Sequence, residues 1–424
     1  MAPPYDVISP AEQENFYTQS EYSAIRLILG KDFPGDNEFN NRYVRAATFL
    51  RGWLQHNILI QDEKPSLYIY EQRFFYKGKK FLRLGFISLL RLEEFGKGKV
   101  YPHEETLSKP KLDRLELMKS TQANLESIFA IYADEKQSLS KYIKKLTKKA
   151  PLINIVDKDK IRHRVWAINQ KPAIAKVIKE MKDKIVFIAD GHHRYEAAMR
   201  YRNMMKSHSQ KFCEDELYNH IMIYFTNIEA KGLLVLPIHR LIKTPPPIAF
   251  EHQLEEYFNI NVFEFSKKTE KRQRKKFFKL LQKIGKEGHV FGMYLKNVSR
   301  YFILTLKDEK LVDEFVEEDK PKAWKYLDVT ILQSLVIDHL LGLKLGTSIL
   351  EENIAFFKNE DEGIDKVNNG DYHIAFFLNP TKVEDIINIA NKFEKMPQKS
   401  TYFYPKLLSG LLMSKICPDD KILP

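Results

Sequence analysis

The chain has 424 residues, which is too long for one ordinary hydrophobic core and favours two or three domains or one enlarged enzyme domain. Hydrophobic residues make up 44% of the sequence, so global disorder is excluded. The 68 Lys and Arg residues against 56 Asp and Glu residues leave a net charge of +12, which suits either an anionic partner or a solvated Lys-rich surface. Two cysteines, Cys213 and Cys417, are too few for a disulfide framework or a cysteine zinc site, so we expect a reducing cytoplasm.

No segment has the pattern of a targeting signal or a membrane span. The first residues, MAPPYDVIS, lack the basic and apolar regions of a signal peptide. The most apolar later stretch, residues 329–345, is interrupted by Gln333, Asp338 and His339. At helical spacing it predicts a buried or half-buried helix and no membrane association.

The N-terminal half predicts a mixture of helices and hairpins. Ser9, Pro10 and Glu12 have the pattern of a helix start with a capping box. Lys77-Gly78-Lys79 separates two apolar runs and predicts the tip of an antiparallel hairpin. We expect helices over residues 42–59, 113–124, 138–149, 172–181 and 195–205, and strands over residues 67–75, 81–92, 126–132, 185–189, 220–227 and 233–237, with two more inside 153–168.

Three consecutive prolines, Pro245 to Pro247, are the clearest break in the chain and predict a domain boundary. We therefore expect a core domain over residues 1–244, a small α/β subdomain over 245–326, and a C-terminal segment over 327–424 that returns to the core. Antiparallel hairpins with scattered helices favour an α+β, or mixed α/β, fold over a doubly wound parallel sheet.

The sharpest motif is Asp190-Gly191-His192-His193-Arg194, which follows an apolar strand and precedes a helix. A strand–turn–helix unit directs the first backbone N–H groups of the helix at one point, where they can bind an anion. Cations in the first helical turn are unfavourable, by a few tenths to about 1 kcal/mol, unless a negative group lies nearby. A phosphate would be such a group. The plain structural alternative is that Asp190 caps the helix and the histidines pack.

A second polar group, Pro102-His103-Glu104-Glu105-Thr106, is expected in a loop. It offers an imidazole, carboxylates and a hydroxyl, which could act as a general base for an alcohol or hold Mg²⁺. No second histidine follows at the spacing of a zinc protease. Taken alone, the segment is equally consistent with an ordinary polar loop.

Three further basic segments are candidates. The first, residues 401–410, places aromatic rings beside Lys406 and Ser409, which could cover a base and contact phosphate or simply pack on the core. The second is the cationic pair His239 and Arg240, which we expect at the end of a strand. The third is the basic helix over residues 267–284, which we interpret as a solvated face rather than a nucleic-acid surface. No P-loop, Rossmann or protein-kinase motif is present, so a nucleotide would need a less common scaffold.

Six motifs in order along the chain resemble the domain-of-unknown-function 1015 family: PPYDVIS at 3–9, PHEET at 102–106, ADGHHRYEAA at 189–198, LPIHR at 236–240, LDVT at 327–330 and KSTYFYPKLLSG at 399–410. Residues 190–194 also resemble the phosphate-binding turn of the ParB/sulfiredoxin-like fold. In that fold, free serine kinases phosphorylate the hydroxyl of L-serine. The resemblance implies a ParB/sulfiredoxin-like nucleotide-binding core, elaborated with extra helices and an inserted subdomain.

These patterns lead to the hypothesis of a cytoplasmic kinase of a small hydroxylated metabolite, with free L-serine as the expected acceptor. The implied cofactors are ATP or ADP and Mg²⁺, and the phosphates would lie at residues 191–194, where cations stabilise the charge. Alternatives are a non-catalytic nucleotide sensor and a ParB-like nucleic-acid-binding protein, although we do not expect a nucleic-acid partner. The sequence leaves open whether the protein forms a homo-oligomer.

The hypothesis gives each candidate residue a role. Glu104 is the expected base, with His103 and Asp190 as alternatives, and His193 completes the catalytic set. Metal ligands would be Glu104 and Asp190. The remaining candidates are assigned to the nucleotide (Gly191, His192, His193, Arg194, His239, Arg240, Lys406 and Ser409) or to the acceptor (Tyr5, Asp6 and Thr106).

Overall fold

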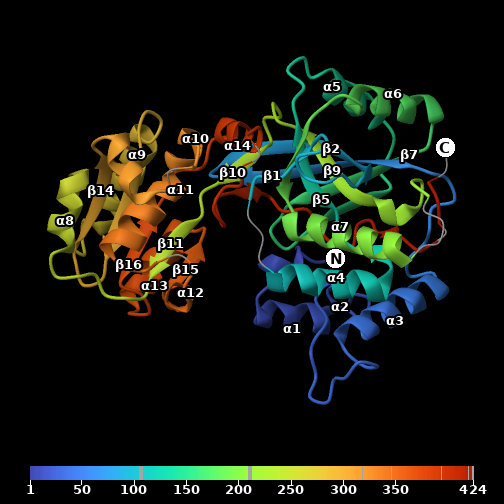
Figure 1. Ribbon diagram of the computed structural model, residues 1–424, viewed down its shortest axis with the longest axis horizontal. Helices are drawn as coiled ribbons and strands as arrows, with labels where there is room; N and C mark the ends of the chain where they lie inside the picture. The colour runs from blue at the N-terminus through green and yellow to red at the C-terminus, as the bar shows by residue number, and fades with distance from the viewer. Residues whose placement is uncertain are drawn as a thin grey trace. The chain divides into compact units, whose positions relative to one another are not determined.

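A computed structural model describes residues 1–104, 108–208, 213–317, 319–344, 346–392, 394–418 and 420–422 (Figure 1). The chain divides into two compact units: unit 1 holds residues 1–234 and 405–424, and unit 2 holds residues 235–404. These boundaries differ from the predicted ones at 244 and 326. The chain leaves unit 1 before Pro245, and residues 327–404 stay in unit 2 because their strands pair with residues 239–242 there.

Unit 1 is built on a sheet of eight described strands in the order β3-β8-β5-β9-β2-β1-β7-β6. Most neighbours are antiparallel, but β3 pairs with β8 and β5 pairs with β9 in parallel. This mixture confirms the mixed α/β class. The strands are β1 (Leu67–Tyr76), β2 (Lys79–Arg91), β3 (Val100–Tyr101), β5 (Ile128–Tyr132), β6 (Ile153–Val156), β7 (Arg162–Ile168), β8 (Val186–Asp190) and β9 (His220–Asn227), and β4 (Ala123–Asn124) pairs separately with β18 (Ser414–Lys415).

One face of this sheet carries the main core of unit 1. Alternate strand residues such as Ile69, Phe86 and Ile188 pack against three helices, and a smaller apolar cluster joins the N-terminal helices. The helices on the sheet are α5 (Ser138–Leu146), α6 (Lys171–Met181) and α7 (His192–His208). The others are α1 (Pro10–Gln19), α2 (Ile25–Ile28), α3 (Arg42–Gln55) and α4 (Ser108–Thr121), with short 3₁₀ turns η1 (Tyr5–Val7) and η2 (Leu217–Asn219).

The opposite face of the sheet is more polar and lies under residues 405–410, which we call the C-terminal strap. Because side chains alternate between faces along a strand, Tyr70, Gln72 and Arg83 point away from the main core. All three are buried. Main-chain carbonyl groups of the strap accept hydrogen bonds from Gln72 and Arg83.

The local signals in unit 1 are largely confirmed. Ser9 and Glu12 form the predicted capping box, with Ser9 Oγ accepting from the Glu12 N–H at 3.3 Å. The β1–β2 hairpin turns at Lys77 and Gly78, both at positive φ. The helix predicted over 113–124 begins earlier, at Ser108, and ends at Thr121, because Ala123 and Asn124 are paired as β4.

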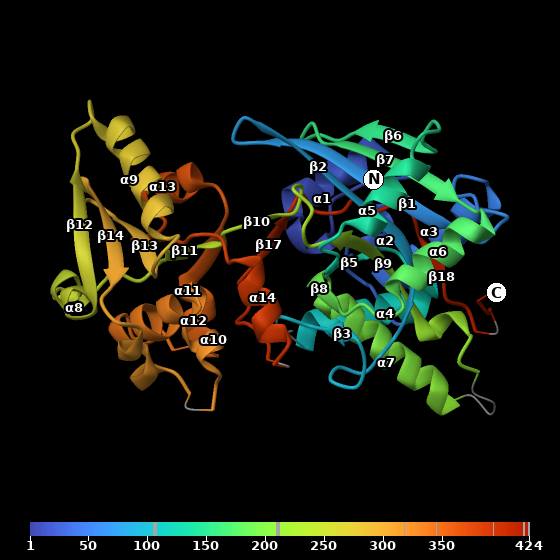
Figure 2. The ribbon, with the colours of Figure 1, turned by 90° about the horizontal axis from the view of Figure 1, so that it is seen from above.

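Unit 2 contains a sheet of six strands among the residues that the structure describes, in the order β12-β14-β13-β16-β11-β15. Helices α9 (Glu270–Ile284) and α13 (Glu360–Asn368) both pack on β13 (Figure 2), and an ion pair of 2.6 Å joins Arg274 of α9 to Asp361 of α13. Phe277 and Leu281 of α9 lie in the core. The strands are β11 (His239–Ile242), β12 (Phe258–Glu264), β13 (Val290–Leu295), β14 (Arg300–Leu306), β15 (Ile354–Phe357) and β16 (Ile374–Phe377), and β10 (Leu234–Leu236) pairs separately with β17 (Tyr402–Tyr404).

The helices of unit 2 are α8 (Phe250–Tyr257), α9 (Glu270–Ile284), α10 (Lys322–Lys325), α11 (Asp328–Ile331), α12 (Ser348–Asn353), α13 (Glu360–Asn368) and α14 (Val383–Ala390), with the 3₁₀ turn η3 (Glu309–Phe315). The predicted apolar helix after residue 327 is confirmed as α11 followed by a π-helix, η4 (Leu332–Leu340), whose apolar side chains are buried. Within the described ranges, no helix is both long and apolar enough to cross a bilayer.

Candidate functional site

The turn that joins β8 to α7 has the geometry that its sequence predicts. Asp190 is the last residue of β8, Gly191 has a φ of +96°, and α7 begins at His192. Glycine is required here because other residues rarely adopt this conformation. A Cβ atom on Gly191 would also lie 3.0 Å from the guanidinium carbon of Arg194.

Two cations converge on Asp190 from different parts of unit 1. Arg194 donates from Nη2 to Asp190 Oδ2 at 2.8 Å and from Nη1 to the carbonyl oxygen of Ser127 at 2.7 Å. Lys406, on the C-terminal strap, donates to Asp190 Oδ1. Burial alone would raise the pKa of Asp190, but Lys406 and Arg194 outweigh that effect and hold it well below its usual value. Asp190 is therefore an anion, and the cations of the turn are balanced in part by the protein itself.

A second carboxylate, Glu126, ties the strap to the N-terminal segment. Ser409 donates from Oγ to Glu126 Oε1 at 2.7 Å, and the Tyr5 N–H donates to the same oxygen at 3.4 Å. Arg114, on α4, lies 3.7 Å from Glu126 Oε2 and stacks 3.8 Å above the ring of Tyr5. Burial raises the pKa of Tyr5. The predicted residues Tyr5 and Ser409 thus belong to the same cluster as Asp190 and Arg194.

The two histidines nearest the turn are interior groups. His103 is fully buried, and its Nδ1 lies 2.5 Å from the carbonyl oxygen of Ile188. Its backbone N–H donates to His192 Nε2 at 3.2 Å, and the two rings meet edge to face. Burial lowers the pKa of His103 to about 4, so the ring is neutral near pH 7. This environment does not suit His103 as a base that contacts substrate, and it makes His103 a support for the turn.

The other predicted residues of this region differ in exposure. Glu104 and His193 are half-buried, and Asp6 is exposed. Asp6, Glu104 and His193 thus have access to solvent. Burial alone would lower the pKa of the Arg194 guanidinium, but the nearby carboxylates of Glu126 and Asp190 outweigh burial and raise it. Asp6 adds a smaller effect in the same direction. Thr106 lies outside the described residues.

Buried polar groups under the C-terminal strap hold Lys406 in place. Gln72 donates from Nε2 to the carbonyl oxygen of Lys406 at 2.9 Å. Arg83 donates to the carbonyl oxygen of Pro405 and, from Nε, to Gln72 Oε1 at 3.0 Å. Burial lowers the pKa of Arg83, whose guanidinium also lies 4.6 Å above the ring of Phe129. The position of Lys406 is therefore set by its backbone as well as by Asp190.

His239 and Arg240 belong to unit 2, whereas Asp190, Arg194 and Lys406 belong to unit 1. They lie on β11 of unit 2, where they begin a strand instead of ending one as predicted. The backbone N–H of Leu378 donates to His239 Nδ1 at 3.1 Å, and Arg240 donates to the carbonyl oxygens of Ile238 and Lys399. Both side chains are buried.

Sequence reasoning missed Arg114, Glu126, Gln72 and Arg83. Arg114, Gln72 and Arg83 lie in ordinary helix or strand patterns, and Glu126 lies in the bend between β4 and β5. Important partners are distant in the sequence: Arg83 meets Pro405, and Glu126 meets Ser409. The one local signal was a polar or charged residue at a position that strand alternation places on a buried face, as for Gln72 and Arg83.

One of the two predicted magnesium ligands, Asp190, already pairs with two cations of the protein. Both carboxylate oxygens of Asp190 accept from cations, Arg194 and Lys406. Among the described residues, no group of three or more His, Cys, Asp or Glu side chains is placed to hold a metal ion. Asp190 therefore acts here as the counter-ion of two side chains and not as a cation ligand.

Fold and site together define an α+β protein with a buried ionic cluster at a strand–turn–helix junction. The family model described as "Protein of unknown function (DUF1015)" matches residues 1–330, so the chain belongs to the DUF1015 family. The expected family is thereby confirmed. No curated protein matches the chain.

Several solved structures show a distant likeness. A mutant of free serine kinase in complex with ADP has a TM-score of 0.36 and 10% identity, over 75% of this chain and 87% of that one. A conserved hypothetical protein from Pyrococcus furiosus has a TM-score of 0.34 and 12% identity, over 76% and 93%. SbnI with a C-terminal truncation, from Staphylococcus aureus, has a TM-score of 0.35 and 9% identity, over 76% and 85%. At these TM-scores and identities, the likenesses carry no argument about activity.

Proposed function

We propose that unit 1 is a cytoplasmic phosphotransferase that moves a phosphoryl group from ATP or ADP to the hydroxyl of a small metabolite, with free L-serine as the first candidate acceptor. The observation that carries the proposal is the convergence of Lys406 and Arg194 on Asp190, at the N-terminus of α7. L-serine is chosen because residues 190–194 resemble the phosphate-binding turn of free serine kinases.

The cluster offers what phosphoryl transfer needs from a protein, which is positioning and stabilisation of negative charge. The N–H groups at the start of α7 and the close backbone approach at Gly191 suit a phosphate. Lys406 and Arg194 would share their charge between Asp190 and the phosphate oxygens. Because Gln72 and Arg83 fix the backbone of the strap, Lys406 is held in position before a ligand arrives.

Glu104 is our candidate for the base. Asp190 is a weak base because its pKa is held low, and His103 is buried and bonded to a main-chain carbonyl. In the proposed step, the acceptor oxygen bonds to the terminal phosphorus while the bond from that phosphorus to the bridging oxygen breaks. The hydroxyl proton passes to Glu104, and the shortened nucleotide leaves with the bridging oxygen. No step is assigned to Mg²⁺, because Asp190 is already occupied by two cations.

A nucleotide sensor without turnover is the second candidate. The specific observation in its favour is that the protein's own carboxylates, Asp190 and Glu126, already balance the cations of the site. Such a protein would bind nucleotide by exchanging one set of ion pairs for another and would need no base.

The direct test incubates the full-length protein with L-serine and either ATP or ADP, with and without Mg²⁺, and measures O-phosphoserine by mass spectrometry. We expect product with the wild type and a loss of about a hundredfold or more in kcat/KM for Lys406→Met, the range seen when one charge-stabilising group is removed. Lys415→Met, which removes an exposed lysine of the same terminal segment, is the matched control. No product with either donor would refute the kinase, and nucleotide binding without product would favour the sensor.

A further inference from the structure

Strand β12 forms an open edge of the sheet of unit 2. It lies at the end of the sheet, with β14 on one side (Figure 2). It has seven residues, whereas the other outer strands of the two large sheets, β3, β6 and β15, have two, four and four. The seven residues pair with β14 in one continuous register. β12 is therefore the longest outer strand among those that the structure describes.

The main-chain groups of Ile260 and Val262 point out of this edge. The carbonyl oxygen of Tyr257 and the N–H of Phe265 both bond to residues that flank β14, at 3.0 Å each. An antiparallel strand directs alternate residues to opposite sides, so the even-numbered residues of β12 face away from β14. In the described part of the chain, no group outside the sheet bonds to the main chain of Ile260 or Val262.

The two ends of β12 are closed by the chain itself, so the open part is the centre. The N–H of Phe258 donates to the carbonyl oxygen of Leu254 in α8, and the carbonyl oxygen of Glu264 accepts from Gln273 at 3.0 Å. None of the residues 258–264 is Lys or Pro, which commonly protect a sheet edge from pairing. The centre of β12 is thus a template for another strand.

We infer that β12 of a second copy of this chain pairs antiparallel with β12, about a two-fold axis at Asn261, and joins the two sheets into one. Ile260 then lies opposite Val262 of the second copy, and the two residues exchange both of their main-chain hydrogen bonds. A two-fold contact uses the same surface on both copies, so it closes as a dimer and does not extend into a fibre.

The side chains along the edge suit a second copy of the same strand. Ile260 and Val262 of the two copies lie on the same face of the joined sheet, and opposed β-branched side chains stabilise a strand pair. Val262 is 46% exposed in the single chain, so the pairing covers apolar surface. Asn261 faces its own copy, and two side-chain amides can donate to and accept from one another.

Charges at the two ends of β12 favour the antiparallel arrangement. Two exposed glutamates, residues 255–256, precede the strand, and two exposed lysines, residues 267–268, follow it. Antiparallel pairing about Asn261 places the acidic end of each copy beside the basic end of the other, which is why we commit to a second copy as the partner. Glu264, the one acid within the strand, lies opposite Arg300 on β14.

The basic helix α9 is the main source of repulsion between the two copies. It packs chiefly on β13 and β14. Neighbouring strands are about 4.8 Å apart, so in the joined sheet the two copies of α9 are about 20 Å apart. The Debye length is about 8 Å at physiological ionic strength. Salt therefore screens most of this repulsion, whereas the strand pairing acts at direct contact.

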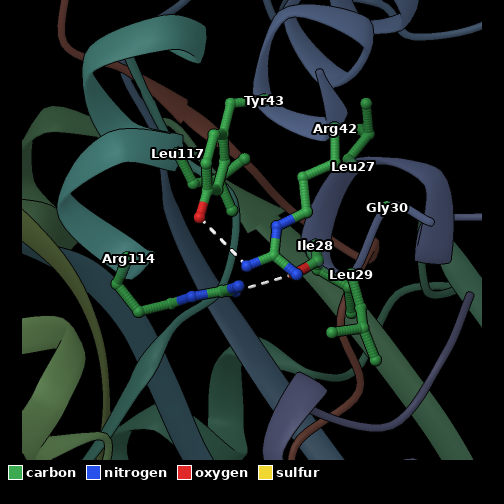
Figure 3. A pocket seen from close by; sticks show the side chains of 8 residues that line it. All are labelled: Leu27, Ile28, Leu29, Gly30, Arg42, Tyr43, Arg114 and Leu117. Carbon is green, nitrogen blue, oxygen red and sulfur yellow. Dashed lines mark hydrogen bonds between the residues drawn. The ribbon is translucent and has the colours of Figure 1, made fainter. Parts of the chain in front are cut away.

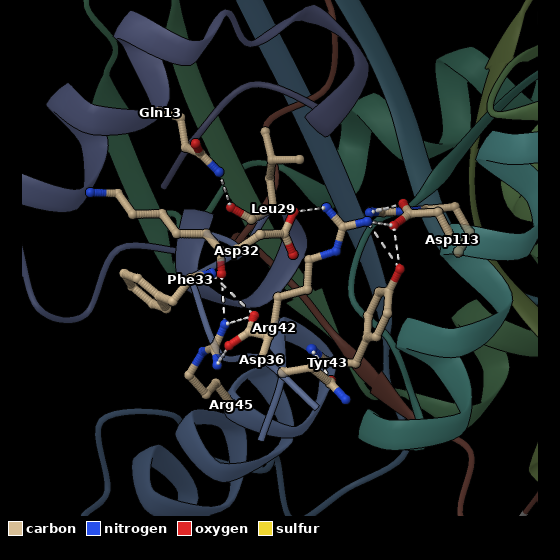
Figure 4. A network of polar contacts seen from close by, with 12 residues as sticks. Gln13, Leu29, Asp32, Phe33, Asp36, Arg42, Tyr43, Arg45 and Asp113 are labelled. Carbon is tan, nitrogen blue, oxygen red and sulfur yellow. Dashed lines mark hydrogen bonds and ion pairs between the residues drawn. The ribbon is translucent and has the colours of Figure 1, made fainter. Parts of the chain in front are cut away.

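The polar groups around α3 in unit 1 provide a contrast. Arg42 and Tyr43 donate to Asp113 at 2.5 and 2.8 Å, and Arg45 donates to Asp36 at 2.7 Å (Figure 4). Arg42 also donates to the Tyr43 hydroxyl oxygen at 3.0 Å, and the pocket that both line leaves about 10 Å³, room for one water (Figure 3). These groups are paired within the chain, unlike the outward main-chain groups of β12.

The first test is sedimentation velocity of the full-length protein over a range of concentrations. A single strand pair is a small interface, so we expect a dimer with a dissociation constant on the order of 100 μM. Hydrogen exchange at high and low protein concentration locates the contact. The amides of Ile260 and Val262 should be protected only at high concentration, and that of Val156 on β6 should be unchanged. A monomer at every concentration would overturn the inference.

Proline substitution tests the strand itself. Val262→Pro removes an outward N–H, a change that an edge strand tolerates, and we expect dimerisation to weaken at least about tenfold. Val156→Pro is the matched control: the neighbouring Asp157 N–H bonds across the ladder to Ile161, so Val156 also faces outward, on β6. We expect it to dimerise like the wild type. Val262→Lys and Val156→Lys repeat the comparison if a proline variant fails to fold by circular dichroism. Equal dimerisation of the Val262 and Val156 variants would overturn the inference.

Charge reversal tests the register. Glu255→Lys places like charges at both ends of the paired strands, and we expect dimerisation to weaken about three- to tenfold. Adding Lys267→Glu restores opposite charges and should return the affinity to within about twofold of the wild type. Equal weakening in the single and the double variant would contradict this pairing. The inference concerns unit 2 and is tested without reference to the phosphotransferase proposed for unit 1.

Discussion

Units 1 and 2 each bury an arginine that the sequence placed beside a histidine, yet the two arginines have different surroundings. Arg194 of unit 1 donates to the Asp190 carboxylate, which also binds Lys406 from a distant segment. Arg240 of unit 2 donates to two main-chain carbonyl oxygens and lies 5.1 Å from the ring of Phe356.

The difference shows which feature distinguishes a cation in a candidate binding site from a cation that only packs in the interior. Hydrogen bonds to main-chain carbonyl oxygens, as at Arg240, involve no side-chain anion that a ligand anion could replace. Arg194 and Lys406 instead share one carboxylate, and in a low-dielectric interior such a cluster can exchange a protein anion for a ligand anion. A histidine–arginine pair after a strand is by itself a weak signal; a carboxylate shared by cations of distant segments is a stronger one.

The largest effect should come from removing the shared carboxylate. Asp190→Asn leaves Arg194 and Lys406 without their common anion in a buried setting, and we expect a loss of about 3–5 kcal/mol in the free energy of unfolding. Urea denaturation at neutral pH measures it. A free energy of unfolding equal to that of the wild type within error would mean that the cluster is not held together by ionic interactions.

A second comparison concerns pH. The buried His103 of unit 1 has a pKa of about 4, below its usual value of 6.5, because burial disfavours its charged form. Between those two values the unfolded chain takes up a proton at this residue and the folded chain does not, so stability falls as the pH drops from about 6.5 to about 4, by up to about 3 kcal/mol. His103→Gln should remove this part of the pH dependence of unfolding, and an unchanged slope would contradict it.

His289 of unit 2 should behave in the opposite way. Burial lowers its pKa, but Asp328 at 2.7 Å and Glu309 at 3.2 Å outweigh that effect and raise it. A group with a raised pKa contributes stability below its usual pKa and loses it as the pH rises through the folded value. His289→Gln should therefore flatten the stability profile above pH 6.5 and leave the acid side as in the wild type. Together, the two variants test whether His103 of unit 1 controls the acid side of the dependence of stability on pH and His289 of unit 2 the side above pH 6.5.

Gly191→Ala tests the turn itself. Because φ is +96° and a Cβ atom would lie 3.0 Å from the Arg194 guanidinium, we expect a loss of about 1–3 kcal/mol in stability together with weaker nucleotide binding. Thermal melts and nucleotide titrations measure the two effects. Gly78→Ala, at a positive φ with open space around it, is the control for backbone strain alone. Equal nucleotide affinity in both variants would show that the turn does not contact the ligand.

The smallest effect is expected in unit 2. Arg240→Met removes donors to the carbonyl oxygens of Ile238 and Lys399 and should cost about 1–2 kcal/mol of stability. We expect nucleotide affinity to stay within about twofold of the wild type. A large loss of affinity would return His239 and Arg240 to the nucleotide site, where the sequence had placed them.

Local signals predicted much of this molecule. The capping box at Ser9, the hairpin at Lys77-Gly78 and the turn at Gly191 depend on neighbouring residues, and all three are found. The domain boundaries were placed differently because strand pairing between residues 239–242 and residues 354–377 is not visible in composition. The candidate residues Asp190, Arg194, Lys406, Ser409 and Tyr5 lie in one cluster, and their roles stay a prediction. Glu126 and Arg114 could not be identified without the long-range contacts that bring them there.

The central claim about unit 1 is that Lys406 and Arg194 form a phosphate-binding site. Equilibrium titration of the full-length protein with ATP, comparing the wild type with Lys406→Met and the control Lys415→Met, addresses this most directly. We expect the wild type and Lys415→Met to bind alike and Lys406→Met to bind at least about tenfold more weakly, the loss for one charge-assisted contact. Identical affinities in all three proteins, or no ATP binding by any of them, would contradict the account.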